Sequence, residues 1–159
     1  MEIHPETPPE GRPLTDLFRA DDISRMMGHL RIMGTQFGIA FADRPFLSNS
    51  RFALHAAEFA REQGKFQELH SGLFSAYFSQ GLDIGNIEIL SQIARDAGLD
   101  EKAMVDSIKS SRYLAQLEKT KEDASSRGVT GVPTFFIGDK KSIVGAQSLD
   151  VFRKTLRSR

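Results

Sequence analysis

The stretch GVTGVPTFFIGDKKSIVG, residues 128–145, decides the fold of this chain. It predicts a loop, an apolar strand, a tight turn at Gly138 and Asp139, and a second strand, because β-branched and aromatic residues flank a Gly-Asp pair. Pro133 stands between the loop and the first strand. A proline there is typical of the first residue of an edge strand or of a turn, and the alternative is a cis peptide bond after Val132. The local sequence leaves both open.

The chain before this stretch predicts helices, because apolar residues recur at helical spacing between N-cap residues and glycines. Asp21 and Asp22 are expected to cap the first helix, and its stripe of Met26, Met27 and Met33 to lie in the core. The expected helices cover residues 23–33, 48–64, 66–78, 86–97, 100–108 and 112–126, with a last one over 148–156. The helix over 66–78 should pack centrally on a wide apolar stripe made of Phe66, Leu69, Leu73, Phe74, Tyr77 and Phe78.

Composition excludes several classes of function. The chain has 159 residues, with 21 basic and 21 acidic side chains. This balance gives no field that would draw the protein to phosphates or anionic lipid, so we expect neither nucleic acid nor membrane partners. Residues 1–13 have neither a basic segment nor an apolar one, and we therefore expect a cytoplasmic location.

Cysteine is absent from the sequence. A chain without cysteine has no disulfide, no thiolate nucleophile, no cysteine zinc site and no dithiol redox couple. The four histidines do not have the spacing of metal ligands, and no metal site is expected. Ser48 and Ser50 lie close to His55 in sequence, but no third orienting acid accompanies them. We therefore expect helix capping by Ser48, Asn49 and Ser50 and packing of His55, rather than catalysis. No catalytic residue is predicted.

Five segments together carry a resemblance that covers nearly the whole chain. They are HPETPPEGR (4–12), SNSRFALHAAEFAREQGK (48–65), LFSAYFSQGLDIGN (73–86), LSQIARDAGLD (90–100) and RGVTGVPTFFIGDK with VGAQSLDVF (127–152). In these segments the chain resembles the DsbA-like thioredoxin family, in particular its FrnE-type branch of cytoplasmic proteins related to disulfide isomerases and 2-hydroxychromene-2-carboxylate isomerases.

The resemblance implies an α/β class, namely an incomplete thioredoxin-like fold with a DsbA-type all-helical insertion. The whole chain, 1–159, would be one DsbA-like domain. Residues 1–13 would form a strand end and connector, 14–127 the mainly helical insertion and return helix, and 128–159 the C-terminal β-β-α part of the thioredoxin motif. Pro133 would then be the cis-proline that faces the active site.

The resemblance also implies a binding site. Thr130, Gly131, Val132 and Pro133 would bind a thiol-containing peptide or a glutathione-like ligand, with the backbone of Val132 pairing to it as an added strand. Asn49 is a further candidate because an asparagine at this position helps to bind ligand in the glutathione-dependent isomerase branch. Apart from the resemblance, Gln147 is a candidate because it lies at the start of the last helix, where backbone amides could hold a carboxylate. Plain capping of that helix is the alternative and the favoured interpretation.

The chain departs from the family at its beginning. Relatives start with a strand and a helix that carries Cys-x-x-Cys or a serine variant, and this sequence begins after that unit. The resemblance therefore implies a thiol-disulfide oxidoreductase or isomerase, whereas this chain alone should be redox-inactive, since exchange needs a thiolate. The alternatives are a glutathione-dependent isomerase or kappa-class transferase relative, with glutathione supplying the thiol, and a non-catalytic peptide-binding protein.

The same departure predicts a partner. In the resembled fold the missing strand lies beside residues Thr134 to Ile137, so the outer edge of this strand would be open. Open apolar edges recruit other chains. We therefore expect a homo-oligomer that forms through the edge of Thr134 to Ile137, or a rearranged sheet.

Overall fold

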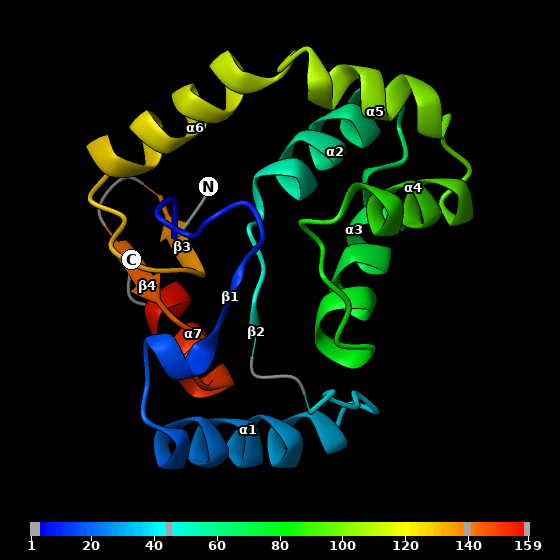
Figure 1. Ribbon diagram of the computed structural model, residues 1–159. Coiled ribbons are helices and arrows are strands. Elements are labelled where there is room, and N and C mark those ends of the chain that lie inside the picture. The colour runs from blue at the N-terminus through cyan, green and yellow to red at the C-terminus, as the bar shows by residue number, and fades with distance from the viewer. Residues whose placement is uncertain (1–3, 44–45, 139–140, 158–159) are drawn as a thin grey trace. The chain divides into compact units, whose positions relative to one another are not determined.

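The computed structural model describes residues 4–43, 46–138 and 141–157, with the side chain of Lys141 left out. Its elements follow one another in the order β1 (Arg12–Pro13), η1 (Leu14–Asp16), α1 (Ala20–Thr35), β2 (Phe46–Leu47), α2 (Arg51–Glu62), α3 (Phe66–Phe74), η2 (Ser75–Ser79), α4 (Ile87–Asp96), α5 (Glu101–Lys109), α6 (Leu114–Ser126), β3 (Thr134–Ile137), β4 (Lys141–Val144) and α7 (Leu149–Arg157) (Figure 1). The strand end expected at residues 1–4 falls largely outside the described residues, and His4 is not in a strand.

Contacts within the chain divide it into two compact units. The first is Met1–Leu117, called the helical unit below, and the second is Glu118–Arg159, called the hairpin unit. The boundary falls inside α6. The domain division that the resemblance implies therefore stays a prediction.

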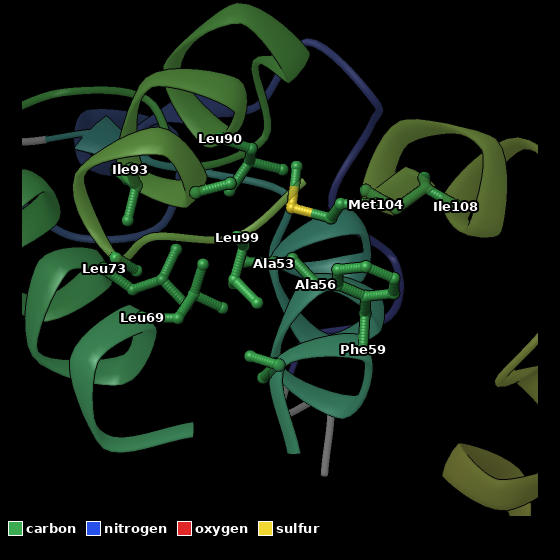
Figure 2. Close-up of a cluster of buried hydrophobic side chains, with 14 of the residues drawn as sticks. Ala53, Ala56, Phe59, Leu69, Leu73, Leu90, Ile93, Leu99, Met104 and Ile108 are labelled. Atoms are coloured by element: carbon green, nitrogen blue, oxygen red, sulfur yellow. The ribbon is translucent and has the colours of Figure 1, made fainter. Parts of the chain in front are cut away.

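The core of the helical unit surrounds α2, because that helix is buried along most of its length. Ala56 and Ala60 are fully buried, and their small side chains let neighbouring helices approach closely. Figure 2 shows the leucines of α3 and α4 and Met104 of α5 gathered against α2. The largest fully buried side chains are those of Leu69, Leu90 and Met104. The described cluster thus joins α2, α3, α4 and α5 into one core.

Two helix starts agree with the sequence. The Asn86 side chain accepts a hydrogen bond from the Glu88 N–H at 2.7 Å, and the Asp100 side chain accepts one from the Ala103 N–H at 3.0 Å. Both are confirmed N-caps, because the side-chain oxygen satisfies an amide that has no partner in its own helix.

Helix α1 differs from the expectation. Its N-cap is Arg19, which makes no side-chain cap, and Asp22 is paired with Arg25 instead of a backbone amide. Met26 and Met33 are exposed, and Ile23 is the buried apolar side chain of this helix. The predictions of aspartate capping and of a core methionine stripe were therefore wrong. The physical reason is that α1 packs mainly on the short turn η1 and not on the helices α2 to α5.

The helix expected over residues 66–78 changes its winding. It is α-helical to Phe74 and then continues as the π-helical turn η2 over Ser75–Ser79. A π turn holds one residue more than an α turn, so it rotates the side chains that follow it. One consequence is that the Tyr77 hydroxyl donates a hydrogen bond to the Phe46 carbonyl oxygen at 2.9 Å, which ties η2 to β2.

The hairpin unit is built on the antiparallel pair β3 and β4. Its register places Thr134 opposite Val144 and Ile137 opposite Lys141, which confirms the predicted pairing of these two strands. Side chains alternate across the hairpin. Phe135 meets Phe152 of α7 edge to face at 4.9 Å, and Phe136 lies under the guanidinium of Arg127 at 4.1 Å. The two phenylalanines thus cover opposite faces of the hairpin.

A buried tyrosine bonds the segment between α5 and α6 to the end of α2. Tyr113 lies between α5 and α6 and is buried. Its hydroxyl donates a hydrogen bond to Glu62 at the end of α2, and Arg112 Nη2 donates to the other oxygen of the same carboxylate at 2.7 Å. Burial, followed by the bond to Glu62, raises the pKa of Tyr113 to about 12.

We expect this contact to make stability fall in alkaline solution. An unfolded tyrosine loses its proton near pH 10, whereas the folded one holds it to about pH 12. Between these values the unfolded chain binds fewer protons, so the free energy of unfolding falls as pH rises, by up to roughly 2.5 kcal/mol. Urea unfolding at a series of pH values should show this fall, and Tyr113→Phe should reduce its slope. Equal slopes in both proteins would contradict the assignment.

Candidate functional site

The loop that precedes β3 begins where α6 ends. Gly128 has φ +71°, a conformation that glycine adopts easily, and its N–H donates to the Ser125 carbonyl oxygen at 2.9 Å. The Val129 N–H donates to the Ala124 carbonyl oxygen at 3.0 Å. These bonds close the last turn of α6 and lead the chain into residues 130–133.

Two hydrogen bonds hold this loop against the hairpin. The Thr134 hydroxyl donates to the Gly131 carbonyl oxygen at 2.6 Å, and the Gly145 N–H donates to the Pro133 carbonyl oxygen at 2.7 Å. The peptide bond between Val132 and Pro133 is cis. The first bond fixes the loop from within β3, and the second fixes it from the end of β4.

Val132 is left at the surface by this arrangement. Its residue is 58% exposed. Among the described residues, neither its N–H nor its C=O has a hydrogen-bond partner. Immediately after it, β3 pairs with β4 along one edge, and no other described strand pairs with its second edge. An extended ligand could therefore add backbone hydrogen bonds at Val132.

Gln147 lies close to the same loop. Its N–H donates to the Gly145 carbonyl oxygen at 3.1 Å, and Gly145 in turn bonds Pro133. The Gln147 side-chain amide donates to the Val144 carbonyl oxygen at 3.0 Å. The structure thus links Gln147 to the segment Thr130 to Pro133, although its amide nitrogen already bonds the backbone of β4.

Asn49 belongs to the helical unit, whereas residues 130–133 and Gln147 belong to the hairpin unit. Its side-chain amide donates to the Thr7 carbonyl oxygen at 2.7 Å, and its side-chain oxygen accepts from the Arg51 N–H at 3.0 Å. Ser50 is the N-cap of α2 but makes no side-chain cap. Of the three residues expected to cap this helix, Asn49 is the one whose side-chain oxygen accepts a backbone N–H, and its amide also bonds Thr7.

His55 is buried on α2, as the packing interpretation expects. Burial, with the nearby charge of Arg51, holds its pKa below the usual value, which favours the neutral ring. Its Nδ1 and the hydroxyl of buried Ser48 have no hydrogen-bond partner among the described residues. No described group of three His, Asp or Glu side chains is placed to hold a metal ion.

A row of aromatic side chains was missed by sequence reasoning. Phe74 and Phe78 were expected in the core, but they are 54% and 39% exposed. The ring of His70 stacks between those of Phe66 and Phe74, at 5.0 and 4.6 Å. The spacing of four residues was visible in the sequence, although it does not distinguish a buried stripe from an exposed one.

None of the described helices is long and apolar enough to cross a membrane. The absence of cysteine from the sequence means that the loop at Val132 has no thiol of this chain beside it.

Comparison with known proteins agrees with this geometry. The uncharacterized protein YwbO of Bacillus subtilis (strain 168) is 34% identical over 105 residues, which are 65% of this chain and 52% of YwbO. The chain therefore spans about half the length of that curated relative. The crystal structure of a probable DsbA oxidoreductase, SCO1869 from Streptomyces coelicolor, superposes with a TM-score of 0.85 at 22% identity. That superposition covers 98% of this chain and 71% of the other and shows a shared fold.

A family model described as the DSBA-like thioredoxin domain matches residues 1–157. This match confirms the thioredoxin-like, helix-rich α/β fold that the segments from HPETPPEGR to VGAQSLDVF predict. By its sequence and its fold, the chain belongs to the DSBA-like thioredoxin domain family.

Proposed function

We propose that this chain binds an extended, thiol-containing peptide at Val132 and Pro133, and that it carries out no thiol–disulfide exchange of its own. The observation that carries the proposal is that Val132, a residue that is 58% exposed, has no described partner for its backbone N–H and C=O beside the second edge of β3. A peptide that runs along this edge would gain two backbone hydrogen bonds at Val132.

The redox part of the proposal rests on chemistry. Disulfide exchange begins when a thiolate attacks a disulfide sulfur, and the sequence supplies no cysteine for that step. The name of the Streptomyces protein states an oxidoreductase activity. Of such an activity, this chain would perform only the binding of the peptide. A FrnE-type subfamily and a cytoplasmic location belong to the same proposal and rest on the segments quoted from the sequence.

Glutathione is the alternative ligand, because it is itself a short extended peptide with a thiol. In that case the ligand would bring the sulfur that the chain lacks. The Asn49 side-chain amide already donates one of its two hydrogens to the Thr7 carbonyl oxygen, and its oxygen accepts from the Arg51 N–H. This structural role makes the peptide the better candidate and glutathione a second outcome of the same test.

We expect the variant Val132→Pro to weaken peptide binding about fivefold to tenfold, because proline has no N–H to donate. The matched control Val132→Ala keeps that N–H and should bind within about twofold of the parent. Fluorescence anisotropy with a labelled, extended peptide that contains one cysteine measures both. Glutathione added as a competitor shows whether it shares the site. Equal loss in both variants, or in neither, would contradict backbone recognition.

Self-association through β3 is a further part of the proposal. The edge of β3 (Thr134–Ile137) that faces away from β4 has no described strand partner. Phe136 of this strand is 39% exposed. A second copy could pair with this edge. The occupied edge would then compete with peptide, so peptide binding and self-association should oppose each other.

Light scattering after size exclusion should give about twice the 17.7 kDa of one chain at high protein concentration. Phe136→Lys should return the mass to that of one chain, because a charge on the edge opposes strand pairing and lies next to Arg127. Phe18→Lys changes an exposed phenylalanine outside the strands and should leave the mass doubled. A single-chain mass at every concentration would refute the pairing.

A further inference from the structure

The backbone of β3 faces its open edge at alternate residues. The Gly145 N–H donates to the Pro133 carbonyl oxygen at 2.7 Å. One step along the hairpin, Thr134 lies opposite Val144. Opposed residues of an antiparallel pair alternate between hydrogen-bonded and non-hydrogen-bonded positions. The N–H and C=O groups of Thr134 and Phe136 therefore point away from β4, toward the edge that no described strand occupies. An added strand pairs its backbone with these two residues.

The face of β3 that carries the Phe136 side chain also carries a cation. The Arg127 guanidinium lies over the Phe136 ring, 4.1 Å from its centroid. Arg127 is exposed. Among the described residues no carboxylate pairs with it, although Asp123 lies one turn earlier on α6. A guanidinium stacked on a ring keeps its N–H donors around the rim of its plane, so these donors are available to a ligand.

The other face of the hairpin is apolar at the neighbouring position. Phe135 is 41% exposed and meets Phe152 of α7 edge to face. Neighbouring side chains of a strand point to opposite faces, and side chains directly opposite each other on paired strands have Cβ atoms about 5 Å apart. The peptide side chain beside Phe136 therefore comes next to the Arg127 guanidinium. The peptide side chain one position away comes next to the Phe135 ring.

We propose that this edge selects a peptide with a carboxylate side chain beside Phe136 and an apolar side chain beside Phe135, and that Arg127 binds the carboxylate. This selectivity rests on the proposed binding of an extended peptide along β3 and adds the class of peptide. Charge complementarity favours an acidic partner, because a basic side chain at the same position meets a like charge. A carboxylate can also accept two N–H groups of the arginine fork. All of these residues belong to the hairpin unit.

Two labelled peptides test this on the full chain by fluorescence anisotropy. They are EVTTCTTVE and QVTTCTTVQ, which differ in their carboxylates and share the cysteine, the valines and the length. Phe136 lies four positions from Val132, so a glutamate at each end of the peptide serves either direction of binding. We expect the glutamate peptide to bind about fivefold more tightly. This preference should shrink in about 0.5 M salt, because exposed charges are screened.

Variants of Arg127 test where the preference arises. Arg127→Gln should reduce it to within about twofold and leave the affinity for the glutamine peptide near that of the parent. Arg127→Lys keeps the charge without the fork and should retain part of the preference. The matched control Lys121→Gln removes one positive charge from an exposed position on the same helix and should keep the full preference.

The outcomes separate this selectivity from the proposed function. Equal binding of the two peptides to the parent overturns the selectivity and leaves peptide binding at Val132 in place. The same holds if Arg127→Gln and Lys121→Gln lose the preference to the same extent, because net charge and not Arg127 would then cause it. If the parent binds neither peptide, the selectivity and the proposed function are both overturned.

Discussion

The hydrogen bond from the Gly145 N–H to the Pro133 carbonyl oxygen determines how the loop at Val132 is presented. It joins the end of β4 to the residue just before β3, so the hairpin and the loop form one piece. Gly145 can donate in this direction because its φ of +81° suits glycine better than other residues. The exposed position of Val132, and with it the proposed function, depends on this closure.

Helix α2 has the corresponding role in the helical unit. Its small alanine side chains let α3, α4 and α5 pack closely against it. Just before the helix, the Asn49 side chain donates a hydrogen bond to the Thr7 carbonyl oxygen. The core formed in this way excludes water from one side of α3 and leaves the rings of Phe74 and Phe78 on the other. One helix therefore supports the packing of the whole unit.

Much of the fold could be predicted from the sequence because local signals agreed with tertiary packing. Asn86 and Asp100 are caps whose chemistry acts within one helical turn, and Phe135 and Phe136 alternate as a hairpin requires. The wrong predictions concern helix faces, because a periodic pattern of apolar residues does not show which element those residues will pack against. The methionines of α1 have helical spacing, but Met26 and Met33 lie exposed and not in the core.

The candidate site shows the same limit. Thr130 to Pro133 and Gln147 could be named from a motif, whereas the missing hydrogen-bond partners of Val132 and Ser48 follow from the arrangement of distant residues. The π turn at η2 was likewise not predicted, because its residues are ordinary helix residues and the Tyr77 to Phe46 hydrogen bond joins segments far apart in the sequence.

The central claim is that this chain offers the binding surface of a DsbA-like domain without thiol chemistry of its own. The rate at which dithiothreitol reduces insulin, measured with and without the full chain, tests that claim most directly. We predict equal rates, because no residue of the chain can form the mixed disulfide through which exchange proceeds. Insulin reduction that rises in proportion to the concentration of the chain would contradict the account.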